Sequence, residues 1–292
     1  GYLEHEDLKN NINKYLDYDF VDNDSKAIDE DALLDEYDEE NNRYSHGTHV
    51  AGIIGAEGNN NMGISGINWD VDIIPLRIFK VEGGNQFFET SALYDAIIYA
   101  VDTAKVDVIN LSLAYITFTK RYYEEFAIIE KALKYAYENN VTVVASAGNG
   151  NENFVYYPAA SQYTIAVGAT SENHKVANYS NYGRALDIVA PGTDILSTHS
   201  FYNKNNSGYM IMSGTSMAAP MVTGTAALLY AEGINDPNSI KDILVNSATE
   251  IYDIKLEKAK LLDIYNAIKR ANNYSNIYDD IIVAATIKKD NI

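Results

Sequence analysis

The chain has 292 residues, of which 47% are hydrophobic, and this length and composition suit one large α/β domain with a sizeable core. It has no cysteine and no apolar run near the roughly 18 residues that cross a bilayer, which excludes disulfide bonds, zinc fingers, thiol catalysis and a membrane-spanning helix. The formal net charge of −19 would repel phosphate backbones, so the composition argues against nucleic-acid binding and suits cation binding.

The first segment with a marked compositional bias is acidic and covers residues 29–40. It predicts a solvated loop or a short surface helix. A second interpretation is that its negative field favours protonation of His46 or attracts cations. The first eight residues do not resemble a signal peptide, and the absence of cysteine leaves the compartment open.

His46 lies in the first motif, the run Ser-His-Gly-Thr-His-Val-Ala-Gly at residues 45–52. Histidine is the natural general base near neutral pH, although a lone histidine more often has a structural role. His46 and His49 could also suggest a metal pair. Their spacing of three residues, with no glutamate after the first histidine, does not match the helix motif of zinc peptidases.

Apolar runs and helical patterns alternate from about residue 73 onward. The apolar runs are short and rich in β-branched residues, and they cover residues 72–79, 106–113, 141–146 and 163–169. Helical patterns cover residues 91–104 and 121–139, and the apolar stretch around residues 218–231 predicts a buried helix. This alternation predicts βαβ units around a parallel sheet.

Two further motifs carry polar groups at the ends of predicted elements. Asn149 follows an apolar strand in the run Ala-Ser-Ala-Gly-Asn-Gly at residues 145–150, where it could donate to an oxyanion or simply mark a turn. Ser216 lies in Met-Ser-Gly-Thr-Ser-Met-Ala-Ala-Pro at residues 212–220, just before an apolar helix. There it could be a nucleophile in the positive field of the helix terminus, or an ordinary N-cap.

Taken together and in this order, the three motifs resemble the subtilase family of serine peptidases. Matching runs at residues 108–113 and 186–192 extend the resemblance over nearly the whole chain, and residues 19–25 resemble the thermitase-type branch. The resemblance implies a three-layer subtilisin-like fold, with a mostly parallel central sheet flanked by helices. It implies one catalytic domain over residues 1–292, with about residues 273–292 as a C-terminal extension.

The resemblance assigns catalytic roles to His46, Ser216 and Asn149. His46 would take the proton from Ser216, whose hydroxyl oxygen would attack the scissile carbonyl of a peptide bond. The side chain of Asn149 and the backbone N–H of Ser216 would hold the oxyanion. His46 would then protonate the leaving amine, and water would hydrolyse the acyl-enzyme. The implied activity is that of a serine endopeptidase.

The resemblance also implies a cleft that pairs with a protein or peptide substrate in an extended conformation, and therefore broad or moderate specificity. Ala114 stands where the family usually has glycine, and Tyr156 stands near the floor of the first specificity pocket unless it is an ordinary surface tyrosine. Their bulk predicts that large aromatic side chains are disfavoured before the cut. The substrate-binding residues by this alignment are Gly83, Gly84, Ser112, Leu113, Ala114, Ala147, Gly148 and Tyr156.

Calcium is the cofactor that the resemblance implies. The first site would join Asp7 to a loop that supplies Asn60, Met62 and Ile64, with Asn59 or Asn61 as alternatives to Asn60. The thermitase-like site would use Asp19, Asp22 and Asp24. The alternative for all of these residues is ordinary turn chemistry, because Asn and Asp favour loops.

One member of the family's catalytic triad has no match in this sequence. The family carries its aspartate in Asp-Thr-Gly or Asp-Ser-Gly at the end of a strand, and residues 1–8 match the continuation from that glycine. We therefore expect the aspartate just upstream of residue 1, on an N-terminal strand that this chain lacks. The alternatives are an inactive subtilase-fold binding or regulatory module, and a dedicated processing peptidase. We expect a secreted or cell-surface protein, with its own pro-segment as a further partner, although the sequence leaves a cytoplasmic location open.

Overall fold

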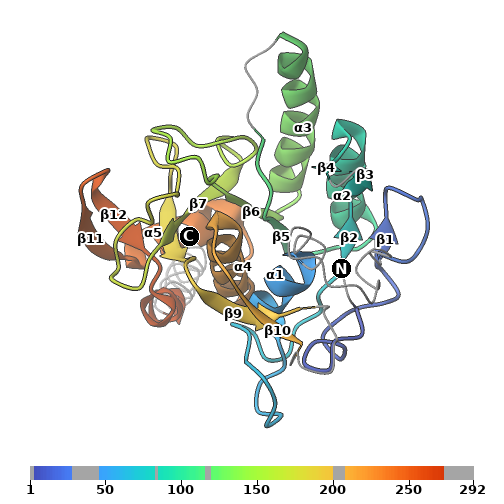
Figure 1. Cartoon of the computed structure of the whole chain (residues 1–292), viewed down its shortest axis with the longest axis horizontal. Helices are drawn as coiled ribbons and strands as arrows, with labels where there is room; N and C mark the ends of the chain where they lie inside the picture. Colours follow the sequence, from blue (N-terminus) through green and yellow to red (C-terminus); the bar gives the residue numbers. More distant parts are fainter. Residues whose placement is uncertain (1–2, 28–45, 83–84, 116–119, 200–207, 273–292) are drawn as a thin grey trace, which may run out of the picture.

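The centre of the molecule is a six-stranded sheet with the strand order β11-β12-β8-β7-β6-β5 (Figure 1). Four neighbouring strands are parallel: β5 (Val108–Leu111), β6 (Thr142–Ser146), β7 (Thr164–Thr170) and β8 (Ile188–Pro191). At the far edge, β12 (Glu257–Leu261) runs parallel to β8, and β11 (Thr249–Asp253) is antiparallel to β12. The computed structural model describes residues 3–27, 46–82, 85–115, 120–199 and 208–272.

The inner strands are buried on both faces, as their β-branched composition predicts. Every residue of β6 and β7 is buried. Along β6, Val143 contributes to one hydrophobic core and Val144 to a second core on the opposite side of the sheet. Because side chains alternate along a strand, two cores mean that both faces of the sheet are covered.

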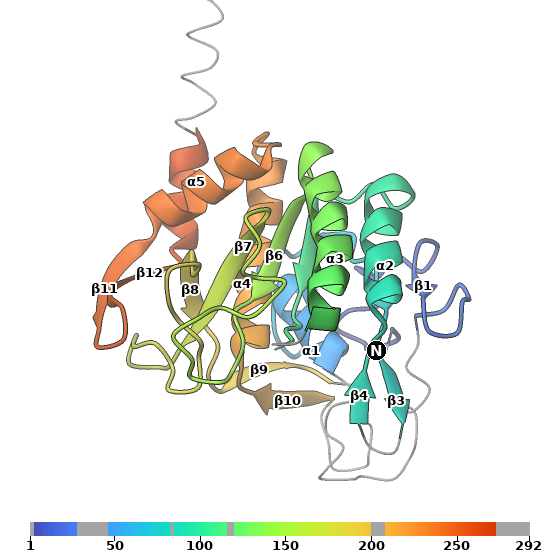
Figure 2. The same ribbon diagram turned by 90° about the horizontal axis from the view of Figure 1, so that it is seen from above.

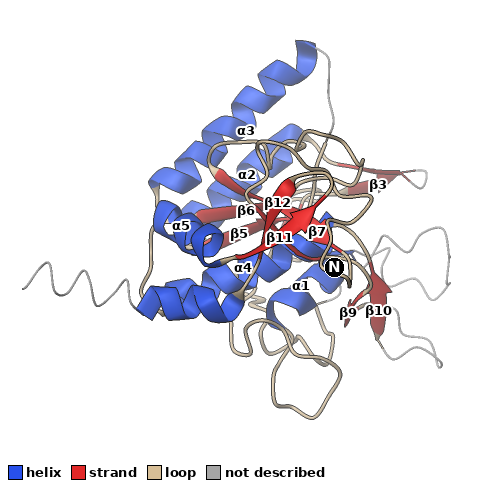
Figure 3. Ribbon diagram, turned by 90° about the vertical axis from the view of Figure 1, so that its left-hand side faces the viewer, coloured by secondary structure: helices blue, strands red, loops and turns tan. Residues whose placement is uncertain are grey.

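Helices form the two outer layers (Figure 3). On one face, α2 (Thr90–Asp102) and α3 (Lys120–Glu138) pack apolar side chains such as Leu93 and Leu133 against the sheet. On the other face lie α4 (Thr215–Ala231) and α5 (Pro237–Ser247), and α1 (His46–Gly55) packs against α4. The predicted three-layer α/β fold is confirmed.

Two antiparallel ribbons lie at one end of the molecule (Figure 2). One joins β3 (Lys80–Glu82) to β4 (Asn85–Phe87), and the other joins β9 (Ile195–Thr198) to β10 (Tyr209–Met212). The β9–β10 ribbon leads directly into α4. In the described part of the chain, no helix combines the length and the apolar character needed to cross a membrane.

The structure differs from the sequence prediction at residues 72–79, which do not join the central sheet. Only β2 (Leu76–Arg77) forms there, and it pairs in parallel with β1 (Tyr18–Asp19) in a separate two-stranded sheet. Consequently β5 is the last strand of the central sheet, and no strand of the described residues pairs with its outer edge.

Candidate active site

The three predicted catalytic residues line one cavity of about 860 Å³. His46 is the first residue of α1, Asn149 follows the end of β6, and Ser216 is the second residue of α4. Residues that are 170 positions apart in the sequence therefore meet at one site. The amino ends of two helices also meet there, and their unpaired N–H groups favour negative charge.

Ser216 sits in the first turn of α4, but it is not yet paired with His46. Its hydroxyl donates to the carbonyl oxygen of Ser112 at 3.4 Å, and no hydrogen bond joins it to the imidazole. Both side chains line the same cavity, but the nucleophile–base hydrogen bond is not made in this conformation.

His46 is half-buried, and neither ring nitrogen has a hydrogen-bond partner among the described residues. Burial, with a smaller contribution from the neighbouring His49, lowers the pKa of His46 to about 4. The imidazole is therefore neutral at pH 7 and able to accept a proton. A histidine without a fixed partner has no preferred tautomer or ring orientation.

Asn149 is held in the orientation that an oxyanion donor needs. Its side-chain oxygen accepts two hydrogen bonds from Thr215, one from the backbone N–H and one from the hydroxyl, each at 2.9 Å. The amide nitrogen of this exposed side chain consequently points the other way and is available as a donor. The sequence gives no sign of this role of Thr215 beyond its position directly before the predicted nucleophile.

The strand end that should bind substrate borders the same cavity. Ser112, Leu113, Ala114 and Gly148 all line it. Ala147 does not: its side chain is fully buried in the core, and its carbonyl oxygen accepts from Tyr156 and Asn181. Ala147 thus holds the segment in place beside Gly148, and its predicted role in substrate binding stays a prediction. Gly83 and Gly84 lie outside the described residues.

Tyr156 lines the cavity and is only 8% exposed, so it is not a surface tyrosine. Its ring covers the end of β6, where a Cβ on Gly148 would lie 2.3 Å from the ring and one on Gly150 would lie 2.1 Å from the hydroxyl. Both neighbours must therefore be glycine for the ring to fit. The tyrosine occupies volume beside the oxyanion site.

The cavity extends along the whole length of β5. Its lining runs from Ala104 and Val106, before the strand, to Ser112 and Ala114, after it. The opposite wall is formed by residues 71–79, and apolar residues of α2 and α1 complete it. The result is a long apolar groove between β5 and β2, with the catalytic residues at the carboxyl end of β5.

Asp7 is fully buried, and among the described residues its carboxylate is held by neutral donors. The amide of Asn60 donates to one carboxylate oxygen at 2.6 Å, and the N–H of Ile64 and the hydroxyl of Tyr209 donate to the other at 3.0 and 3.1 Å. Asn60, rather than either neighbouring asparagine, reaches the carboxylate. Met62 takes part through its backbone, which donates to the side-chain oxygen of Asn60.

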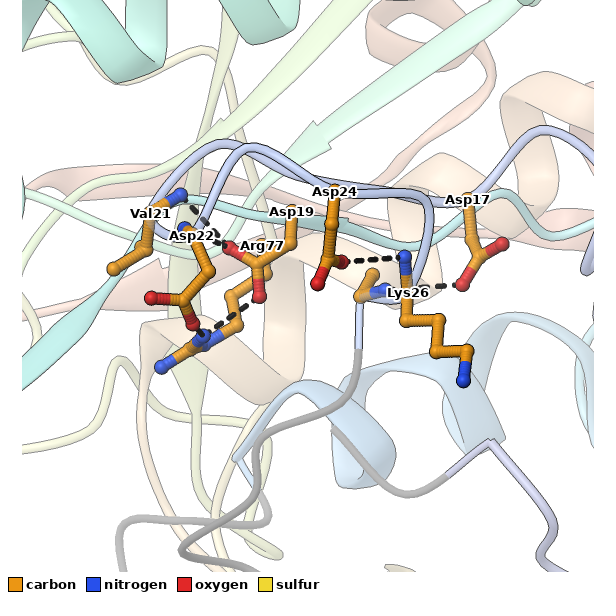
Figure 4. A network of polar contacts seen from close by, with 8 residues as sticks. Asp17, Asp19, Val21, Asp22, Asp24, Lys26 and Arg77 are labelled. Carbon is orange, nitrogen blue, oxygen red and sulfur yellow. Dashed lines mark hydrogen bonds and ion pairs between the residues drawn. The ribbon is translucent and has the colours of Figure 1, made fainter.

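The second predicted calcium site holds an arginine instead (Figure 4). The guanidinium of Arg77 contacts Asp19 at 2.6 Å and Asp22 at 2.7 Å, and Asp24 accepts from the backbone of Lys26. The described residues contain no group of three acidic or histidine side chains placed to hold a metal ion. A side chain 58 positions after Asp19 thus supplies positive charge to two of these three aspartates, so the predicted cation there stays a prediction.

Comparisons with known proteins agree with the fold and identify the family. A model of the subtilase family matches residues 2–274. The chain is 40% identical over 232 residues to a thermophilic serine proteinase of Bacillus sp. strain AK1, covering 80% of this chain and 50% of that protein. It is 35% identical over 234 residues to thermitase of Thermoactinomyces vulgaris, covering 80% of this chain and 73% of that protein.

Solved structures of subtilisin-like proteases resemble this fold. A protease of Pseudoalteromonas arctica superposes with a TM-score of 0.76 at 29% identity, covering 93% of this chain and 87% of that chain. The chain spans half or less of the length of the first curated relatives that it matches, between 24% and 50%.

Proposed function

Because this chain belongs to the subtilase family, we propose that it is a serine endopeptidase in which Ser216 is the nucleophile, His46 the general base and Asn149 an oxyanion donor. The observation that carries the proposal is the meeting of these three side chains at one cavity, with the amide nitrogen of Asn149 left free by its two bonds from Thr215.

The chemistry follows from the positions of these groups. The hydroxyl of Ser216 turns from the Ser112 carbonyl toward the neutral imidazole of His46, which takes its proton as the oxygen attacks the peptide carbonyl. Negative charge on the carbonyl oxygen is stabilised by the Asn149 amide and the N–H groups that begin α4. His46 then protonates the leaving amine, and water releases the acyl group.

A further part of the proposal is that the triad aspartate enters on a strand that fills the groove between β2 and β5. The groove supports this, because it is apolar, lies between two strands that both run parallel in their own sheets, and ends at His46. The free outer edge of β5 offers backbone groups for pairing. A carboxylate at the end of such a strand would fix the tautomer of His46.

The proposed substrate is an extended protein or peptide segment that pairs with residues 112–114. Recognition through the backbone gives broad or moderate specificity, limited by Ala114 and by the ring of Tyr156. We place the protein outside the cell or at its surface, where a broad peptidase does not attack cytoplasmic proteins, and its own pro-segment is a candidate ligand of the cleft.

We include one calcium site in the proposal, at the carboxylate of Asp7. A fully buried carboxylate with no cationic side chain among the described residues is costly, and a divalent cation would offset its charge. Rotation of the Asn60 amide by 180° would present its oxygen to that ion. Chelation should lower the unfolding temperature of the wild-type chain, and calcium should restore it. Asp7→Asn should remove this dependence, and an equal chelator effect in that variant would argue against the site.

The decisive experiment is covalent labelling of Ser216 with a fluorophosphonate probe, with Ser216→Ala as the control. Both proteins carry the proposed Asp-bearing segment in front of residue 1, since residues 1–292 by themselves should react slowly. Labelling of the wild-type protein but not of Ser216→Ala would support the peptidase. A second candidate function, an inactive binding or regulatory module, is favoured by the unpartnered imidazole of His46 and predicts no labelling. Digestion of a peptide library would then separate a broad peptidase from a dedicated processing enzyme.

A further inference from the structure

The backbone carbonyl of Ser216 lacks the hydrogen bond that a regular helix would give it. In a helix, the carbonyl of residue 216 accepts from the N–H of residue 220, but residue 220 is proline and has no N–H. The hydroxyl of Ser112 donates to that carbonyl instead, at 2.8 Å. A side chain at the end of β5 therefore completes the first turn of the helix that carries Ser216.

Ser112 also accepts a hydrogen bond itself and so belongs to a longer series of hydrogen bonds. The amide nitrogen of Asn110 donates to the Ser112 hydroxyl at 2.9 Å, and the hydroxyl of Thr223 donates to the Asn110 side-chain oxygen at 2.8 Å. Thr223 lies seven residues, or about two helical turns, after Ser216, and therefore on the same face of α4. This series of hydrogen bonds from Thr223 through Asn110 and Ser112 to the Ser216 carbonyl, which we call the relay, begins and ends on α4 and passes through the end of β5.

The direction of donation along the relay determines whether the Ser216 carbonyl receives a proton donor. Because Thr223 donates to its oxygen, Asn110 presents its nitrogen to Ser112, and the single proton of Ser112 remains for the Ser216 carbonyl. If the Asn110 amide turned over, its oxygen would draw the Ser112 proton, and the carbonyl of Ser216 would lose its donor.

We infer that Thr223 and Asn110 are positioning residues for the peptidase reaction, acting through Ser112 on the backbone of Ser216. This inference rests on the proposed function. The relay ties the nucleophile and its oxyanion-binding N–H to the strand end, residues 112–114, that borders the cleft. Neither Thr223 nor Asn110 touches the reacting atoms. Loss of either side chain should therefore affect the rate of acylation more than substrate binding.

The test compares two buried threonines of the same helix. Thr223 bonds to Asn110 and also approaches the carbonyl of Ala219, whereas the partner of Thr225 among the described residues is the carbonyl of Met221. Thr223→Val and Thr225→Val each remove one buried hydroxyl without changing side-chain shape, and only Thr223→Val takes a donor from the side-chain oxygen of Asn110. Thr223→Ser retains the hydroxyl and should rescue.

We expect Thr223→Val to slow fluorophosphonate labelling of Ser216 about three- to tenfold, the effect of one hydrogen bond on a rate. On a peptide substrate, kcat should fall and KM should stay the same. Thr225→Val and Thr223→Ser should label within about twofold of wild type. Labelling of Thr223→Val at the rate of Thr225→Val would overturn the inference.

Hydrogen exchange separates this inference from the proposed function. If the wild-type protein is not labelled even with the Asp-bearing segment joined in front of residue 1, the peptidase proposal fails, but the relay still predicts faster amide exchange over residues 214–219 in Thr223→Val than in Thr225→Val. Equal exchange in the two variants would overturn the relay whatever the outcome of labelling.

Discussion

Two hydrogen bonds from one neighbour decide what Asn149 can do. Thr215 occupies the side-chain oxygen with both its N–H and its hydroxyl, so only the amide nitrogen can face a reacting carbonyl. The hydroxyl of Thr215 also accepts from the N–H of Gly148, which ties the end of β6 to the start of α4. A donor held in advance costs no reorganisation during the reaction, which is why it stabilises the transition state efficiently.

Asn149→Ala should therefore lower kcat by roughly 10²–10³, the size of effect measured for an oxyanion-hole asparagine in subtilisin, with little change in KM. The physical reason is that charge develops on the carbonyl oxygen only in the transition state. Steady-state kinetics on a peptide substrate checks this. The matched control is Asn153→Ala, an exposed asparagine of the same loop. An unchanged kcat would remove Asn149 from the mechanism.

Tyr156 should set a limit on the residue before the cut. Its buried ring fills space beside the oxyanion site, so a large aromatic side chain should compete with it. Tyr156→Gly should raise the ratio of kcat/KM for Phe over Ala at that position by about tenfold or more, in line with a pocket gain of one to three kcal/mol. The ratio is independent of any loss of folded protein. Efficient wild-type cleavage after Phe or Trp, unchanged by the substitution, would refute this role.

At the scale of elements, Arg77 connects β1 to β2 by charge as well as by strand pairing. The Asp19 side chain is only 2% exposed, whereas Asp22 is 63% exposed, although both contact the same guanidinium. Asp19 also accepts from the N–H groups of Val21 and Asp22, so its carboxylate organises the whole turn. The ion pair with Asp19 is therefore the one whose loss leaves a buried charge.

Arg77→Leu should lower the free energy of unfolding by about 3–5 kcal/mol, because it leaves the buried Asp19 carboxylate without its partner. Asp22→Asn is the matched control and should cost less than about 1 kcal/mol, since that pair is exposed to water. Urea unfolding measures both. Added calcium should not rescue Arg77→Leu, and a rescue by calcium would show that these aspartates can bind a cation after all.

The elements that could be predicted from the sequence are those whose pattern is local. An unbroken apolar composition predicts the buried strand at residues 141–146 and the helix after Ser216. The motifs around His46, Asn149 and Ser216 indicate where their strands and helices begin or end. Residues 72–79 have an equally strand-like composition but form only β2, because strand formation needs a neighbour in register. Likewise, the spacing of Asp19, Asp22 and Asp24 contains no sign of Arg77, and nothing in the sequence joins Thr223 to Asn110.

At the scale of the whole molecule, buried histidines should make stability depend on pH. Burial, followed by the charges of His49 and His5, lowers the pKa of His199 to about 4, and burial also lowers the pKa of His46 to about 4 and that of His49. The folded pKa lies below the unfolded value of about 6.5, so the unfolded state binds more protons between these two limits. Stability is therefore full above about pH 6.5 and falls as the pH drops toward 4.

His199→Leu should reduce the loss of unfolding free energy between pH 7 and pH 4.5 by on the order of 2 kcal/mol, because one buried titrating group is gone. Urea unfolding at the two pH values gives the slope directly. His174→Asn is the control, since His174 is exposed and its backbone conformation (φ 56°) is one that asparagine tolerates. The same pH dependence in His199→Leu and in wild type would place the acid sensitivity elsewhere.

The groove between β2 and β5 links the stability of the whole molecule to its chemistry. Backbone groups on the outer edge of β5 have no strand partner among the described residues, and the apolar walls on both sides face open space. A parallel strand placed there would join the two sheets into one and bury those walls. Its last residue would then arrive at His46, where a carboxylate has two effects: it fixes the tautomer of the imidazole, and it raises the pKa of His46 from about 4 by stabilising the protonated form.

The proposed strand therefore predicts two separable gains. An apolar segment ending in Asp-Thr or Asp-Ser, joined in front of residue 1, should raise the unfolding temperature and should increase peptide turnover by roughly 10⁴, which is the cost of removing the aspartate from subtilisin. The same segment with the aspartate replaced by asparagine should give the gain in stability without the gain in turnover, because it fills the groove but supplies no charge. Equal turnover from the Asp and Asn segments would disconnect the groove from catalysis. Full activity from residues 1–292 alone would mean that another carboxylate already serves His46.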